Sequence, residues 1–183
     1  YIYMEYITQS PGYWYMYYLY GKCRGIIHQY INNDDIFEAN EILDGIYISN
    51  IWTTYNKDEM KKRGITHIVN AILGVDPPYP EDFNYLKLEV IDMKDEKLGD
   101  YFDDTYKFID NAMNNNGKVL IHCICGVSRS VTILCAYMIK KYGYSPNKAL
   151  KIIKEKRNIA NPNPSFRKQL EEYYIDNIKH QYK

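Results

Sequence analysis

The stretch VLIHCICGVSRSVTIL, residues 119–134, places two cysteines, a glycine and an arginine between two apolar runs. The first run, within KVLIHC at 118–123, is continuous, which is typical of a strand covered on both faces. The second run, from Ser130 to Tyr142, is long and apolar enough for a largely buried helix. Ligands bind at the carboxyl ends of parallel strands, where a loop enters a helix, so the sequence predicts a functional loop here.

Strands alternate with helices on both sides of this loop. Strand patterns cover residues 46–49, 65–71 and 84–92. Helical patterns cover residues 56–64, 101–113 and 164–178, and Gly64 ends the first of them. A further helix starts with Ser145 as its cap and Pro146 in its first turn. The alternation predicts an α/β fold with a central, mainly parallel sheet flanked by helices.

The 183 residues fit one globular domain preceded by an N-terminal extension. A polar cluster at residues 32–35 precedes the first predicted strand, so we expect a Tyr-rich extension over 1–39 and a compact domain over 40–183. Residues 6–21 of the extension carry no charge but match neither a membrane span nor a signal peptide. An aromatic arm is expected; an interfacial anchor is the alternative, but it lacks the usual basic face. We therefore expect no membrane partner.

The balance of charges and the cysteine content limit which binding partners and which cellular compartment we expect. Lys plus Arg balance Asp plus Glu at 23 each, which argues against nucleic-acid binding and makes any anion recognition local. The four cysteines form neither a disulfide ladder nor a zinc pattern. We expect a cytoplasmic protein, with the nucleus as a second compartment, and neither a metal nor an organic cofactor.

The loop residues themselves suit phosphate chemistry. Gly126 permits tight curvature, so the amides of residues 124–129 can converge on an oxyanion. Arg129 can add a bidentate clamp, whereas the Gly-Lys-Ser/Thr of a nucleotide-binding loop is absent. Such surroundings lower a cysteine pKa to about 3.5–7.5, which produces a thiolate nucleophile. A lone cysteine at a strand end is more often simple packing, but the ordered set of Cys, Gly, Ser and Arg favours the nucleophile.

These residues resemble a known family. HCICGVSRS, residues 122–130, matches the His-Cys-x5-Arg-Ser loop of the cysteine-dependent protein phosphatases, and its Gly-x-Ser-Arg-Ser ending is similar to the dual-specificity branch. The resemblance extends over residues 40–178 and includes EILDGIYISN (41–50), ITHIVNA (65–71), YFDDTYKFIDNA (101–112) and ANPNPSFRKQL (160–170). It implies that residues 40–183 are a dual-specificity phosphatase catalytic domain, which hydrolyses phosphotyrosine and phosphoserine or phosphothreonine through a phosphocysteine.

The resemblance also implies roles for individual loop residues. Cys123 attacks the phosphorus, Arg129 holds the equatorial oxygens, and Ser130 hydrogen-bonds the thiolate. The whole loop is expected to bind phosphate, and it comprises Ile124, Cys125, Gly126, Val127, Ser128 and Arg129. Cys125 occupies a variable position and is expected to fill space, with redox modulation as the alternative.

The resemblance also implies roles for Asp92, Asn163 and His122, which lie outside the phosphate-binding residues 124–129. Asp92, Asp95, Glu96 and Asp100 are all candidates for the general acid, and the family spacing selects Asp92. Asn163 matches an asparagine expected to brace the loop, although Ser165 stands where glycine is common. His122 is either a supporting residue that tunes the thiolate or a buried histidine satisfied by backbone groups.

Substrates and rival functions follow from length and loop charge. The domain is too short for the deep cleft of tyrosine-only phosphatases, so a shallow pocket should accept all three phosphoamino acids. The uncharged loop side chains disfavour inositol lipids and RNA triphosphates. Phosphoprotein substrates are the expected partners, and dimerisation through the extension stays open without a supporting motif. The alternative function is an inactive phosphoprotein-binding pseudophosphatase, which the presence of Cys123, Arg129 and Asp92 disfavours.

Overall fold

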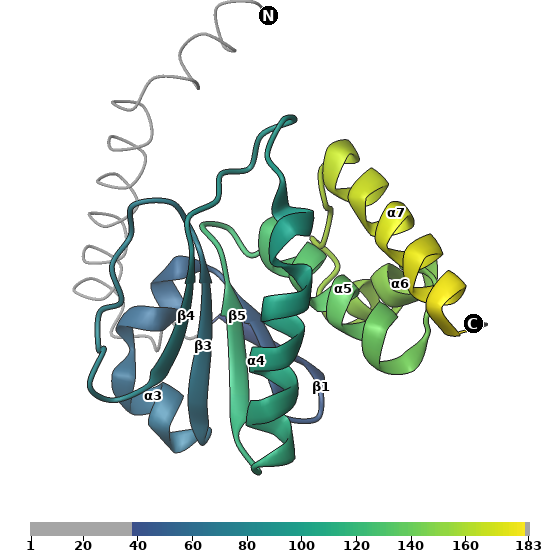
Figure 1. Cartoon of the computed structure of the whole chain (residues 1–183). Coiled ribbons are helices and arrows are strands. Elements are labelled where there is room, and N and C mark those ends of the chain that lie inside the picture. Colours follow the sequence, from purple (N-terminus) through teal and green to yellow (C-terminus); the bar gives the residue numbers. More distant parts are fainter. Residues whose placement is uncertain (1–37, 182–183) are drawn as a thin grey trace, which may run out of the picture. The chain divides into compact units, whose positions relative to one another are not determined.

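Five strands form a single sheet in the computed structural model, which describes residues 38–181 (Figure 1). The strands lie in the order β1-β2-β5-β3-β4, and their bounds are β1 Ala39–Leu43, β2 Ile46–Ser49, β3 Ile65–Ala71, β4 Asn84–Leu88 and β5 Lys118–His122. Strands β2, β5, β3 and β4 run parallel, and β1 pairs antiparallel with β2 at one edge. The predicted mainly parallel α/β fold is confirmed.

Strand β5 lies at the centre of this sheet, between β2 and β3. Val119, Leu120 and Ile121 have no exposed surface. A strand flanked by two others and covered on both faces requires apolar residues at successive positions. The continuous apolar run that precedes Cys123 is thereby explained.

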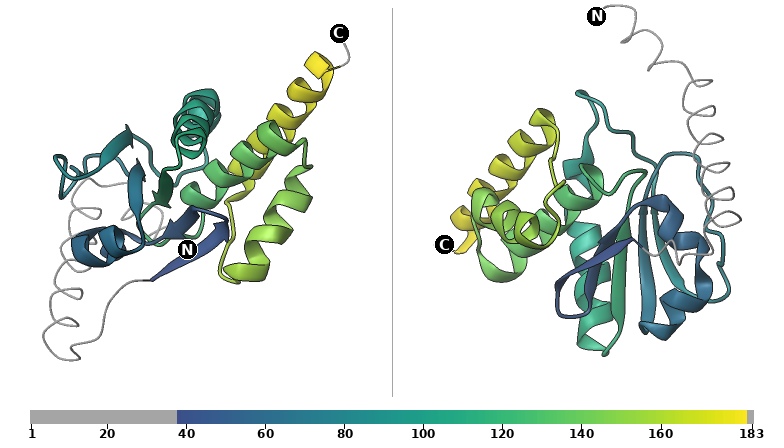
Figure 2. Two further views of the ribbon diagram at one scale, coloured as in Figure 1. Left: turned by 90° about the horizontal axis from the view of Figure 1, so that it is seen from below. Right: turned by 180° about the vertical axis from the view of Figure 1, so that it is seen from behind.

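Helices cover both faces of the sheet. They are α3 Lys57–Lys62, α4 Phe102–Asn114, α5 Arg129–Tyr142, α6 Pro146–Lys156 and α7 Pro164–Gln181, with the short 3₁₀ helices η1 Ile51–Tyr55 and η2 Leu98–Tyr101. Helix α3 packs on β3, on the face opposite α4 (Figure 2). Helix α5 contacts α4, α6 and α7 as well as β5 and β2, and its first eleven residues, 129–139, are buried. The unit of β5, loop and α5 is therefore held on several sides.

Two strands differ from the prediction. Strand β1 was not expected; it joins β2 through a tight turn in which Gly45 has a φ of 74°. The strand predicted over 84–92 ends at Leu88, because its neighbour β3 ends at Ala71, the residue paired with Leu88. Residues 89–92 consequently leave the sheet and form a loop at its carboxyl edge.

The predicted N-terminal extension falls almost wholly outside the described residues. The division at residue 39 therefore stays a prediction, as do the aromatic arm and dimerisation through it. Within residues 38–181, no helix combines the length and the apolar character needed to cross a bilayer.

Candidate active site

The loop between β5 and α5 closes tightly over the carboxyl edge of the sheet. Gly126 has a φ of 67°, in the left-handed region that favours glycine. A Cβ at this position would lie 2.6 Å from the carbonyl oxygen of Ser49. Glycine is required here for both reasons, as the sequence predicted.

Cys123 lies at the base of the loop, and only 2% of its surface is exposed. The Gly126 N–H donates to its sulfur at 3.2 Å, and the Ser130 hydroxyl lies 3.4 Å away. Burial alone raises the pKa of the thiol, but the Arg129 charge, the Ser130 hydroxyl and backbone amides outweigh burial, so the pKa lies below its usual value. Cys123 thus has the surroundings of a stabilised thiolate.

Arg129 begins α5 and is anchored at one end. Its Nη1 donates to the carbonyl oxygens of Ala71 and Val90 at 2.9 and 3.1 Å. Its buried Nε has no hydrogen-bond partner among the described residues, although it lies 3.5 Å from Asp92 Oδ2 as an ion pair. A buried N–H without a partner costs about 1–3 kcal/mol, which an anion accepting from it would relieve.

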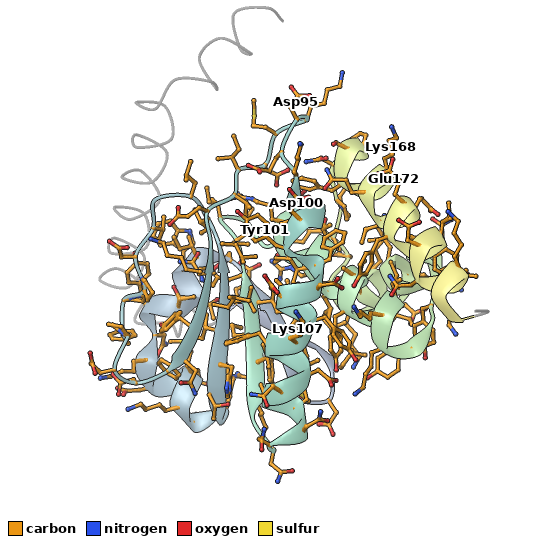
Figure 3. The ribbon with its side chains drawn as sticks, in the orientation of Figure 1. Asp95, Asp100, Tyr101, Lys107, Lys168 and Glu172 are labelled. Atoms are coloured by element: carbon orange, nitrogen blue, oxygen red, sulfur yellow. The ribbon has the colours of Figure 1, made fainter. Side chains whose placement is uncertain are left out.

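Asp92 is the acid candidate whose carboxylate reaches this loop. Its Oδ1 accepts from Ser128 Oγ at 2.9 Å and from Asn163 Nδ2 at 2.8 Å. Glu96 instead accepts the Ile91 N–H, and Asp95 lies at the tip of the connection between β4 and α4, away from the loop (Figure 3). Asp100 lies in η2, near the start of α4. The structure brings Asp92 to the loop, as the family spacing predicted.

Asn163 connects the acid, the loop and α7. Its side-chain amide donates to Asp92, and its backbone N–H donates to Ser128 Oγ at 3.1 Å. Its Oδ1 accepts the N–H of Phe166 at 2.9 Å, in the manner of a helix N-cap. These bonds form with Ser165 in place of the usual glycine. Asn163 therefore contacts both halves of the site.

His122 is buried directly before Cys123. Burial lowers its pKa to about 3, a shift that a hydrogen bond with the Cys123 backbone opposes and the Arg129 charge reinforces. Its Nδ1 has no hydrogen-bond partner among the described residues. A histidine in this state is neutral at physiological pH, and its role in tuning the thiolate stays a prediction.

The remaining loop residues direct their carbonyls away from Cys123 onto neighbouring elements. The carbonyl of Ile124 accepts from the Ile51 N–H at 3.1 Å, and that of Val127 accepts from the Asn161 N–H at 2.8 Å. Cys125 is exposed, whereas Cys123 is buried.

Two contributors were missed by sequence reasoning. Ser128 was predicted only as a loop residue, yet its hydroxyl links Asp92 to Asn163. Arg157, from the end of α6, donates to the carbonyls of Gly126 and Cys125. Its position in EKRNIANPNP carries no motif, so only the tertiary structure could reveal it.

Comparison with known proteins agrees with this geometry. The family profile "Dual specificity phosphatase, catalytic domain" matches residues 46–176. The chain is 42% identical over 136 residues to Dual specificity protein phosphatase 1B of Arabidopsis thaliana. This match covers 74% of this chain and 81% of that protein. It is 38% identical over 133 residues to the human Protein phosphatase Slingshot homolog 2, where the match spans 73% of this chain but 9% of that protein.

Solved structures share the fold at somewhat lower sequence identity. The crystal structure of DUSP15 is 33% identical, with a TM-score of 0.74, and the match covers 79% of this chain and 92% of that chain. The human tyrosine phosphatase-like serine/threonine/tyrosine-interacting protein is 31% identical, with a TM-score of 0.75 and coverage of 76% and 97%. The matches define a protein phosphatase, a hydrolase that acts on phosphoproteins. The chain belongs to the dual-specificity phosphatase family.

Proposed function

We propose that this chain hydrolyses phosphotyrosine, phosphoserine and phosphothreonine in proteins with Cys123 as its nucleophile. One observation carries the assignment: a buried thiol of lowered pKa faces loop amides and Ser130, beside an arginine whose buried Nε has no hydrogen-bond partner among the described residues. A phosphate group offers oxygens to these donors and phosphorus to the sulfur.

In the first step the Cys123 thiolate attacks phosphorus. The S–P bond forms as the bond from phosphorus to the substrate oxygen breaks, and protonated Asp92 donates its proton to that leaving oxygen. Arg129 and the loop amides bind the three oxygens of the transferring group, whose charge they stabilise. The products of this step are the dephosphorylated hydroxyl and a phosphocysteine.

In the second step water replaces the sulfur. The Asp92 carboxylate accepts a proton from the attacking water, the O–P bond forms, and the S–P bond breaks to return the thiolate. Ser130, 3.4 Å from the sulfur, stabilises the thiolate as it leaves by donating a hydrogen bond. Inorganic phosphate then departs, and no cofactor enters either step.

The proposed substrate range follows from the loop and the size of the domain. None of the five loop side chains between Cys123 and Arg129 is charged, so the additional phosphates of an inositol lipid or an RNA triphosphate would lack counter-charges there. A domain of this length also leaves little chain for a deep tyrosine-only cleft. We place the activity on phosphoproteins of the cytoplasm, or of the nucleus as a second compartment.

Hydrolysis of para-nitrophenyl phosphate by the purified chain under reducing conditions tests the proposal. The chain should turn over, and Cys123→Ser should abolish turnover while phosphopeptide binding persists. Equal turnover on phosphotyrosine, phosphoserine and phosphothreonine peptides of one sequence would support the substrate range. A folded wild-type chain that binds phosphopeptides without any turnover would instead support the inactive binding module.

A further inference from the structure

Arg157 connects the outer side of the phosphate loop to the first strand. This residue is the C-cap of α6, directly after Lys156, and only 3% of its surface is exposed. Two of its hydrogen bonds reach loop carbonyls: Nε donates to Gly126 O at 2.7 Å, and Nη2 donates to Cys125 O at 3.2 Å. Two others reach side chains before and within β1, with Nη1 donating to Asn40 Oδ1 at 2.6 Å and Nη2 to Glu38 Oε1 at 3.2 Å.

The two loop carbonyls determine where the next two amides point. In a planar trans peptide the C=O and the following N–H point in opposite directions, and no described peptide bond is cis. Because the Cys125 carbonyl faces Arg157, the Gly126 N–H faces the other way, where it donates to Cys123 Sγ at 3.2 Å. The Gly126 carbonyl likewise turns the Val127 N–H inward, and the hydrogen bond of that amide helps to lower the pKa of Cys123.

The chemistry of this contact favours arginine specifically. A guanidinium presents several N–H donors in one rigid plane, whereas a lysine ammonium is a point charge on a flexible stem. The loop also packs directly on this plane, since a Cβ on Gly126 would lie 2.7 Å from Arg157 Nη2. Glu38, at 3.2 Å, supplies the counter-charge that a buried cation requires.

We propose that Arg157 is a positioning residue for phosphoryl transfer, which holds two successive loop peptides with their N–H groups turned toward Cys123 and the bound phosphate. The inference rests on the proposed function, because it assigns these amides to the same reaction. Arg157 lies behind the loop and acts through its backbone. Without it, either peptide can rotate, which replaces an inward donor with a carbonyl oxygen that repels the thiolate and the phosphate oxygens.

The test measures Cys123 directly, in a Cys125→Ser background so that one loop thiol reacts. The rate of alkylation of Cys123 by iodoacetamide is followed against pH, with and without inorganic phosphate as a protecting anion. In Arg157→Met the alkylation midpoint should move to higher pH, phosphate protection should weaken at least about tenfold, and kcat/KM should fall about 10²-fold. Arg157→Lys should fall between the wild type and Arg157→Met, since an ammonium keeps N–H donors but lacks the planar fork of the guanidinium.

A matched variant separates positioning from general destabilisation. Ile153→Val trims a fully buried side chain one turn earlier in α6, on the residue whose carbonyl accepts the Arg157 N–H. It should lower the melting temperature and leave the alkylation profile and phosphate protection unchanged. Should Arg157→Met fail to fold, Asn40→Ala removes one brace of the guanidinium and should weaken phosphate protection about threefold, in the same direction.

Two outcomes separate this inference from the proposed function. A folded Arg157→Met, or Asn40→Ala in its place, with the wild-type alkylation profile and phosphate protection overturns the inference, even when turnover has fallen. A wild-type chain without turnover whose alkylation profile still shifts in Arg157→Met contradicts the proposed function and supports the positioning role.

Discussion

The phosphate loop and the acid-bearing connection between β4 and α4 hold the two halves of the proposed chemistry. In the loop, Cys123 and Ser130 lie seven residues apart in the sequence, between a buried strand and a buried helix. The Asp92 carboxylate instead depends on Ser128 and Asn163, which lie 36 and 71 residues away along the chain. The first half comes from one local segment, whereas the second joins Asp92 and Asn163, which are distant in the sequence, to Ser128 of the loop. Substitutions should therefore affect the two halves differently.

After Cys123→Ser, which should abolish turnover, the largest effect is expected at Arg129 in the same loop. Arg129→Lys loses the planar fork that contacts both the Ala71 and Val90 carbonyls and the transferring phosphate. We expect kcat/KM on an aryl phosphate to fall about 10³-fold. Arg167→Lys is the matched control, because Arg167 makes similar bonds to Pro162 and Asn161 outside the loop and should change kcat/KM little. Comparable losses of kcat/KM in Arg129→Lys and Arg167→Lys would contradict a specific role of Arg129 in the reaction.

The acid comes next, and its effect should depend on the leaving group. Asp92→Asn keeps the bonds to Ser128 and Asn163 within reach but cannot donate a proton to the substrate oxygen. Phosphoserine peptides, which release an alkoxide, should lose about 10²-fold in kcat, whereas an activated aryl phosphate should lose far less. A loss of the same size on both substrates would indicate that Asp92 only maintains the structure of the loop.

Ser130 should affect the second chemical step more than the first. Ser130→Ala removes a hydrogen bond to a charged sulfur, which contributes about 1.5–3 kcal/mol and corresponds to about 10- to 100-fold in kcat. Stopped-flow measurements on an aryl phosphate should show a burst of phenol release followed by slow turnover. If the steady-state rate is unchanged and no burst appears, Ser130 does not assist the departure of the sulfur.

Asn163→Ala should produce a smaller loss, shared between activity and stability. It removes the side-chain hydrogen bond to the Asp92 carboxylate, so kcat/KM should fall about tenfold. The lost cap of α7 should also lower the free energy of unfolding by about 1 kcal/mol in a denaturant titration. Asn177→Ala, which removes a bond to the Tyr173 carbonyl later in α7, should leave kcat/KM unaltered.

The smallest effect is expected at the second loop cysteine. Cys125 contributes its backbone carbonyl to the Arg157 contact, and its side chain is exposed, in contrast to the buried Cys123. Cys125→Ser should therefore change kcat/KM less than about twofold under reducing conditions, where loss of a surface side chain is within about 0.5 kcal/mol. A loss as deep as that of Cys123→Ser would reverse the assignment of the nucleophile.

The same contrast explains how much the sequence could predict. The strand, the glycine-containing turn and the helix of the loop are contiguous, so apolar runs and residue types were sufficient to locate the loop and its arginine, Arg129. The roles of Cys123 and Ser130 required the resemblance to the phosphatase family. Asp92 required family spacing, because four carboxylates occur between residues 92 and 100 and nothing local separates them. The Asp92 contacts of Ser128 and the loop contacts of Arg157 required the tertiary structure.

Errors in the predicted strands have the same origin. The strand over 84–92 was predicted too long, since hydrophobicity continues past Leu88 while its partner β3 stops at Ala71. Strand β1 was missed because ANEIL contains two adjacent polar residues, and it is stabilised as a strand by pairing with β2 rather than by its own pattern. In both cases the limit of a strand is set by its neighbour in the sheet.

Identification of the covalent intermediate tests the central claim most directly. Ser130→Ala, which should slow its hydrolysis, is mixed with para-nitrophenyl phosphate, quenched in acid and digested, and the peptide spanning both loop cysteines is sequenced by tandem mass spectrometry. The account predicts one phosphoryl group on the sulfur of Cys123 and none on Cys125. A phosphoryl group on Cys125, or turnover without any phosphocysteine at the earliest times, would contradict it.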